Sequence, residues 1–161
     1  MVRKGLGLLV ALALLLSMAP AQALEINLEG FPLVTEPVTL SITGVRDANQ
    51  VEWKDMLFFK VYQEMTGVTL DFQEVPRTGW AERKNLMFAA NELPDMIICG
   101  AIGPNEIVMY GMESGQLLPI NDYIDSYMPN FKALCDQHPT VLQAITAPDG
   151  NMYTVPSIAT A

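Results

Sequence analysis

The order of hydrophobic periodicities in residues 38–99 constrains the fold of this chain more than any other feature of its sequence. Residues 38–43 and residues 68–73 alternate apolar and polar side chains, which is the period of a β-strand. In residues 95–99 the apolar side chains are consecutive, as they are in a strand that is covered on both faces. We therefore expect three strands in this region.

Two helices are expected between these strands. Residues 51–66 place their large apolar side chains on a single helical stripe, and Gly67 is a typical stop for such a helix. A second helix is expected over residues 79–91, where Thr78 is placed to cap its start. Strand, helix, strand, helix, strand in this order predicts parallel pairing with right-handed crossovers. The predicted fold class is α/β, a mostly parallel open sheet with helices on both faces.

The rest of the chain is predicted to be mainly helical. A short helix is expected over residues 105–113. Residues 130–146 carry one apolar stripe that contains Pro139, and proline is tolerated in the first turn of a helix but not in its interior. We therefore expect two successive helices that meet near His138. Residues 152–156 are expected to form a last short strand.

Residues 1–23 have the pattern of a cleavable secretory signal peptide. Arg3 and Lys4 supply the positive start, residues 6–16 the apolar stretch, and residues 21–23 (AQA) the small-residue cleavage site. The apolar stretch is too short to span a bilayer. This segment predicts an exported protein, periplasmic or extracellular, that is soluble after cleavage of the signal.

The acidic composition limits the partners of the chain. The formal net charge is −9 at pH 7, which argues against nucleic acid and against anionic membrane surfaces as partners. Residues 24–37, with Pro32 and Pro37, are expected to form a flexible leader ahead of the first strand.

The two cysteines, Cys99 and Cys135, leave two interpretations open. Cys99 ends an apolar run and Cys135 lies on an apolar helical stripe, so two buried thiols are the simpler interpretation. A disulfide in an oxidising compartment is the alternative, and it requires that the two Cα atoms lie close together. Neither cysteine directly follows the apolar stretch of the signal, so no lipid anchor is predicted.

Motifs for cofactor and metal chemistry are missing from the sequence. It has no GxGxxG after its first strand, no GxxxxGK[ST] and no GxSxG. A single histidine, His138, supplies neither a metal-ligand set nor much choice for a catalytic triad. We therefore predict no cofactor, no metal and no catalytic residue.

Polar side chains gather where the predicted strands end, which is where open α/β sheets bind their ligands. Arg46, Asp47 and Asn49 follow the first strand, and they either contact a ligand or serve only as turn and cap. Arg77 and Trp80 follow the second strand. An indole there can stack on the apolar face of a sugar while Arg77 donates to hydroxyls; alternatively, Trp80 packs its helix onto the sheet and Arg77 is solvated. These five residues are the predicted ligand-binding set.

The chain resembles a known family in several segments. An export signal is followed by a strand that begins at residue 38 and by an amphipathic helix that ends at residues 66–68 (TGV). Residues 91–97 (NELPDMI), 115–124 (GQLLPINDYI) and 147–156 (APDGNMYTVP) then resemble, in order, three motifs of the extracellular solute-binding proteins of sugar-type ABC importers. Asn151 stands where the family usually has lysine.

The resemblance implies a type II periplasmic-binding-protein-like fold in which residues 38–161 form an incomplete amino-terminal lobe. It also implies the capture of an extracellular solute, a carbohydrate or oligosaccharide, for import by a membrane permease of an ABC transporter, without enzymatic activity. Residues 155–161 look like a strand that enters a fold continuing elsewhere. The alternatives are a small secreted α/β hydrolase that acts on glycans with paired carboxylates, and an inactive truncated product.

Overall fold

The structure is a computed structural model that describes residues 24–158, so the predicted signal peptide lies outside the described residues. The elements follow in chain order: β1 (Val38–Arg46), the 3₁₀ turn η1 (Trp53–Asp55), α2 (Leu57–Thr66), β2 (Val68–Pro76), the 3₁₀ turn η2 (Arg77–Gly79), α3 (Trp80–Ala90), β3 (Met96–Ile98), α4 (Pro104–Ile107), the π-helical turn η3 (Val108–Glu113), α5 (Asn121–Tyr127), α6 (Pro129–Gln137) and α7 (Pro139–Ile145).

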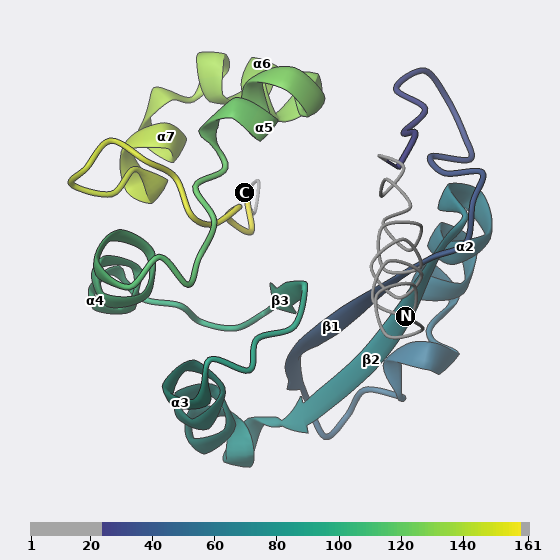
Figure 1. Cartoon of the computed structure of the whole chain (residues 1–161), viewed down its shortest axis with the longest axis horizontal. Helices are drawn as coiled ribbons and strands as arrows, with labels where there is room; N and C mark the ends of the chain where they lie inside the picture. The colour runs from purple at the N-terminus through teal and green to yellow at the C-terminus, as the bar shows by residue number, and fades with distance from the viewer. Residues whose placement is uncertain (1–23, 159–161) are drawn as a thin grey trace, which may run out of the picture.

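The three strands form one parallel sheet in the order β2-β1-β3. β1 pairs with β2 over its whole length, so that Arg46 lies opposite Pro76. On its other side β1 pairs with β3, where Gly44 lies opposite Ile98. Figure 1 shows the two long strands, β1 and β2, side by side. In the chain, α2 connects β1 to β2, and α3 connects β2 to β3. The predicted α/β class and the parallel pairing are confirmed.

Apolar side chains cover both faces of the sheet, because alternate residues of a strand point to opposite sides. On one face Phe59 of α2 lies between Trp53 and Phe72, with ring centroids 5.9 Å and 5.0 Å away. On the other face α3 packs its apolar residues against the strands. This second cluster comprises Val45, Trp80 and Met87, with Val75, Leu93 and Ile97 packed against it.

The helices after β3 form a separate group. Figure 1 shows α5, α6 and α7 together, across β3 from α2. The ring of Tyr110 in η3 stacks on Phe88 of α3 at a centroid distance of 3.7 Å, which joins η3 to the helix that packs on the sheet. α6 and α7 meet at His138, as the position of Pro139 predicts.

The first strand is longer than predicted. β1 continues through Gly44 to Arg46, whereas the sequence suggests a stop at the glycine. A Cβ atom at residue 44 would lie 1.8 Å from the backbone oxygen of Ile98. The glycine is therefore needed for the close approach of β1 and β3 and does not end the strand.

Three other expectations need correction. β3 lies at the edge of the described sheet, and its coverage is incomplete, because Met96 is 38% exposed while Ile97 and Ile98 are half-buried. Thr78 does not cap α3, because the turn η2 precedes the helix and Gly79 occupies the cap position without a side-chain hydrogen bond. The expected strand at residues 152–156 is only an isolated bridge between Thr146 and Met152.

The leader runs alongside the end of α2. The backbone N–H groups of Leu33 and Val34 both donate to the carbonyl of Thr66, and the Val34 side chain is buried. Ile26 and Val34 form an isolated bridge. Within residues 24–158 no helix is long and apolar enough to cross a membrane.

Candidate functional site

The carboxyl ends of the three strands meet at one edge of the sheet. Because the strands are parallel and in register, the residues after Arg46, Pro76 and Ile98 emerge side by side. The candidate site consists of the three loops that begin there: residues 47–52, 77–79 and 99–103.

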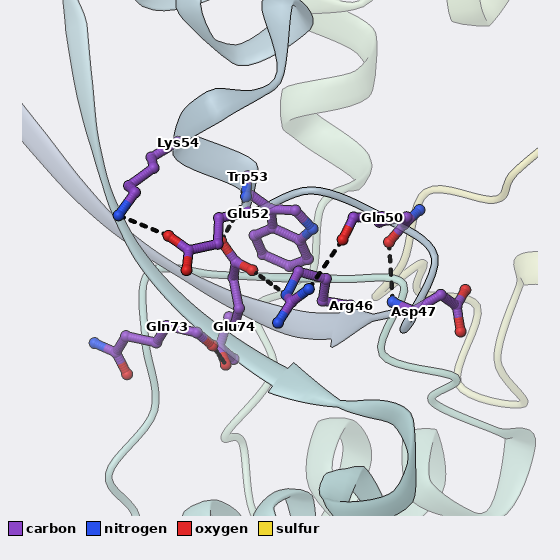
Figure 2. A network of polar contacts seen from close by, with 9 residues as sticks. Arg46, Asp47, Gln50, Glu52, Trp53, Lys54, Gln73 and Glu74 are labelled. Atoms are coloured by element: carbon purple, nitrogen blue, oxygen red, sulfur yellow. Dashed lines mark hydrogen bonds and ion pairs between the residues drawn. The ribbon is translucent and has the colours of Figure 1, made fainter.

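Arg46 holds the first loop in place. Its Nε lies 2.6 Å from Oε2 of Glu74, and its Nη1 donates to the carbonyl of Gln50 at 3.0 Å. The other oxygen of Glu74 accepts from the backbone N–H of Trp53 at 2.6 Å. Figure 2 shows the Arg46 guanidinium between Glu74 and Gln50, with the Trp53 ring beside it. The side chains of Arg46 and Glu74 are 29% and 15% exposed, and Arg46 Nε contacts Glu74 as an ion pair without a well-aligned hydrogen bond, so Arg46 supports the loop through this pair and through Gln50.

Gln50 closes the same loop into a turn. Its side-chain oxygen accepts from the backbone N–H of Asp47, and its backbone N–H donates to the carbonyl of Asp47, both at 3.0 Å. Asn49 is exposed within this turn. Sequence reasoning missed Gln50, although its place directly after Asp47 and Asn49, two turn-forming residues, is a signal that could have been used.

Asp47 and Arg77 connect the first two loops. Arg77 donates from Nε and Nη2 to the two carboxylate oxygens of Asp47, at 2.5 Å and 2.9 Å. The hydrogen bond from Arg77 holds the pKa of Asp47 below its usual value, and the same bond raises the pKa of Arg77. Their side chains remain 39% and 70% exposed, so the pair presents a planar cation and a carboxylate to solvent.

Trp80 lies in the core. It is 6% exposed, and its Nε1 donates to the carbonyl of Gly100 at 2.7 Å. The structure therefore brings Arg46, Asp47, Asn49 and Arg77 together at the strand ends. It places Trp80 beneath the third loop, in the packing role that the sequence left as its alternative.

The third loop has an unusual backbone. Cys99 and Ala101 are not glycines, yet their φ angles are +52° and +47°. Cys99 is exposed and Cys135 is buried, and both are free, so the expectation of two buried thiols is wrong for Cys99. The loop ends at Gly103, whose N–H donates to Oε2 of Glu106 at 2.8 Å.

An open depression of about 500 Å³ lies beside β2. Its walls come from β2, from the end of β1 and from the residues around η1. The lining residues are Arg46, Glu52, Lys54, Leu70, Asp71, Phe72 and Glu74. Among residues 24–158 no group of three metal-ligating side chains comes together.

Comparison with known proteins gives a consistent result, although no family model matches the chain. The chain is 30% identical over 140 residues to the fructooligosaccharide ABC transporter substrate-binding protein FusA of Streptococcus pneumoniae, covering 86% of this chain and 26% of that protein.

Solved structures agree with the sequence comparison. The structure of FusA in complex with kestose superposes with a TM-score of 0.70 at 28% identity, over 76% of this chain and 25% of FusA. The structure of the alginate-binding protein AlgQ2 without calcium ion superposes with a TM-score of 0.63 at 32% identity, over 80% of this chain and 26% of AlgQ2. An HMO-binding, ABC-transporter-associated solute-binding protein from Bifidobacterium longum infantis shares the fold, with a TM-score of 0.65 at 23% identity, over 74% of this chain and 23% of that protein.

These similarities confirm the resemblance noted in the sequence. The sheet and its helices form part of a lobe with the fold of ABC-transporter substrate-binding proteins. The chain spans about a quarter of the length of the relatives that it matches.

Proposed function

We propose that this chain belongs to the substrate-binding component of an ABC importer and that it captures a carbohydrate, most simply an oligosaccharide, outside the cytoplasm. The similarity to FusA and AlgQ2 supports this function, since FusA is a fructooligosaccharide substrate-binding protein and AlgQ2 is an alginate-binding protein. In this proposal the protein is exported by its signal peptide, delivers the solute to a membrane permease and catalyses no reaction.

The observation that carries the proposal is the exposed Asp47–Arg77 pair at the carboxyl edge of the parallel sheet. A guanidinium presents several donors in one plane, and a carboxylate presents acceptors only. The hydroxyl groups of a sugar are both donors and acceptors, so the pair can engage neighbouring hydroxyls from two sides. Asn49, exposed in the adjoining turn, adds an amide with both capacities.

The remaining members of the predicted set have supporting roles in this proposal. Arg46 fixes the loop that carries Asp47 and Asn49 through its contacts with Glu74 and Gln50. Trp80 fixes the third loop through Gly100. The solute is therefore held by hydrogen bonds from Asp47, Asn49 and Arg77 on a framework built by Arg46 and Trp80.

The described carboxyl groups do not favour the alternative of a glycan hydrolase. Such an enzyme needs one carboxyl whose pKa is raised so that it can donate a proton near neutral pH. Where the pKa of a described carboxyl is clearly shifted, it is lowered, as for Asp47, Asp95, Glu106 and Asp149.

Calorimetric titration of the full chain with kestose, nystose and alginate oligosaccharides tests the proposal. We expect saturable binding of at least one of these compounds, with no change in the compound after prolonged incubation. Turnover of any of them would contradict the proposal, and so would the absence of binding across the set.

A further inference from the structure

Lys84 is the buried charge that the site described above does not use. The residue is only 9% exposed, although it lies in a helix whose neighbouring residues Glu82, Arg83 and Asn85 are exposed. A lysine is rarely buried unless its ammonium group has partners, because removing the charge from water is costly.

The partners of Lys84 belong to the third loop and to α4, the helix that follows it. Nζ donates to the carbonyl of Ala101 at 3.1 Å and lies 2.7 Å from Oε1 of Glu106. The other oxygen of Glu106 accepts from the backbone N–H of Gly103. This partly buried ion pair therefore holds the loop at Ala101 and at Gly103, on both sides of Ile102.

Trp80 lies one helical turn before Lys84, and it donates a hydrogen bond to the same loop at the carbonyl of Gly100. The fit there is close, because a Cβ at residue 100 would lie 2.5 Å from the Ile97 side chain and 3.4 Å from the indole of Trp80. A single face of α3 thus contacts the loop backbone at Gly100 and Ala101, while Glu106 of α4 contacts it at Gly103.

The loop needs this restraint because its backbone is in an unfavourable conformation. Cys99 and Ala101 both have φ values in the left-handed region, which residues with a Cβ seldom adopt. Such conformations persist only where the surroundings enforce them, and they gather at ligand-binding sites. In this structure the enforcing contacts come from Trp80, Lys84 and Glu106.

We infer that Lys84 is a positioning residue for solute capture, which holds the loop of residues 99–103 in the conformation that the solute meets. The inference rests on the proposed function, because the loop begins at the same sheet edge as the loops that carry Asp47 and Arg77. If the loop is already formed, binding of the solute does not have to order it. The apparent affinity is the intrinsic affinity multiplied by the fraction of molecules in which the loop is formed, so a loosened loop lowers it.

Amide hydrogen exchange of the full chain without solute tests the first half of the inference. In Lys84→Met, which keeps the apolar stem, amides of residues 100–103 are expected to exchange about tenfold faster, while those of β1 and β2 keep their rates. Lys84→Arg should restore slow exchange, since it retains the charge and the donors. Lys60→Met, an exposed lysine on α2, serves as the control and should change nothing.

Glu106→Gln provides a second variant if Lys84→Met folds poorly. It retains an acceptor for Gly103 and removes the charge that faces Lys84, and faster exchange confined to residues 100–103 is expected again. Unchanged loop exchange in both variants would overturn the inference, and so would an equal acceleration across the whole chain.

Titration with kestose tests the second half. If the wild-type chain binds kestose, Lys84→Met should raise the Kd about tenfold, matching a loop that is formed in about one molecule in ten. An unchanged Kd with a loosened loop would overturn the positioning role. If the wild-type chain binds none of the oligosaccharides, the proposed function fails, and the exchange data still decide whether Lys84 orders the loop.

Discussion

The ring of Tyr153 lies flat against Gly111, so close that a Cβ atom at residue 111 would be 2.9 Å from two of its ring carbons. The hydroxyl of Tyr153 donates to Asp149 at 2.7 Å, which keeps the ring from moving away. This contact joins the π-helical turn η3 to the last described segment of the chain. The glycine at residue 111 is therefore required by packing.

Gly111→Ala is expected to lower the free energy of unfolding by about 1–3 kcal/mol, because the added methyl group must displace a held ring. Gly79→Ala is the matched control: its nearest neighbouring atom would lie 3.9 Å from the new Cβ, and its φ is −100°. This variant should stay within about 0.5 kcal/mol of the wild type. Urea denaturation followed by circular dichroism measures both, and equal stabilities for the two variants would contradict the packing argument.

Asp95 should make the stability of the chain depend on acid pH. Its Oδ2 accepts from the hydroxyl of Ser41 at 2.6 Å and from the backbone N–H of Ser41 at 2.8 Å, and these bonds lower its pKa from 3.8. Because the folded pKa is lowered, the stabilisation is fully present above the unfolded pKa. It is lost as the pH falls through the folded value.

Asp95→Asn should therefore unfold at lower urea than the wild type near neutral pH, and the difference should shrink below about pH 4. The measurement is the urea midpoint at a series of pH values. Ser41→Ala removes the hydroxyl that donates to Asp95. The double variant should therefore lose less stability than the sum of the losses in the two single variants. A difference between wild type and Asp95→Asn that is independent of pH would show that this carboxyl does not titrate as described.

The two thiols should react at very different rates. Cys99 is exposed in the third loop, whereas Cys135 is 2% exposed on α6. A thiol reagent such as dithionitrobenzoate should label Cys99 under native conditions and Cys135 only after unfolding. Cys99→Ser should abolish the rapid reaction, and two equivalents reacting rapidly in the folded chain would contradict the described burial.

The sequence predicts the order of strands and helices well because that order rests on local periodicity. The alternation in residues 38–43 and 68–73 and the apolar stripe in residues 51–66 are each visible within one element. The exact extents were harder to predict, as Gly44 shows. Its role depends on the approach of Ile98, which lies 54 residues later in the chain and is brought close only by strand pairing.

The candidate site is predicted less completely for the same reason. Topology alone places Arg46, Asp47 and Arg77 at one edge of the sheet. Topology does not reveal that Arg46 forms an ion pair with Glu74, because the proximity of these two residues depends on the register of β1 and β2. The partner of Lys84, Glu106, lies beyond β3 on another helix, so no local pattern reveals that this lysine is buried.

The exposed Asp47–Arg77 pair gives the most direct test of the proposed binding site. Arg77→Ala should weaken the binding of kestose about 10- to 100-fold, because hydrogen bonds to charged groups contribute about 1.5–3 kcal/mol. Asp47→Asn keeps the shape but removes the charge that orients Arg77, so a smaller loss of affinity is expected. Lys132→Ala is the control, since Lys132 forms an exposed ion pair with Asp125 where α5 and α6 pack together.

Thermal unfolding separates binding from stability in these variants. An exposed ion pair adds little to folding, so Arg77→Ala and Lys132→Ala should both melt close to the wild type. Only Arg77→Ala should then lose part of the stabilisation that a fixed concentration of kestose gives, because this stabilisation grows with the logarithm of the ligand concentration divided by Kd. If both variants kept that stabilisation in full, Arg77 would not contact the solute, and the binding surface would have to be sought elsewhere along the three loops.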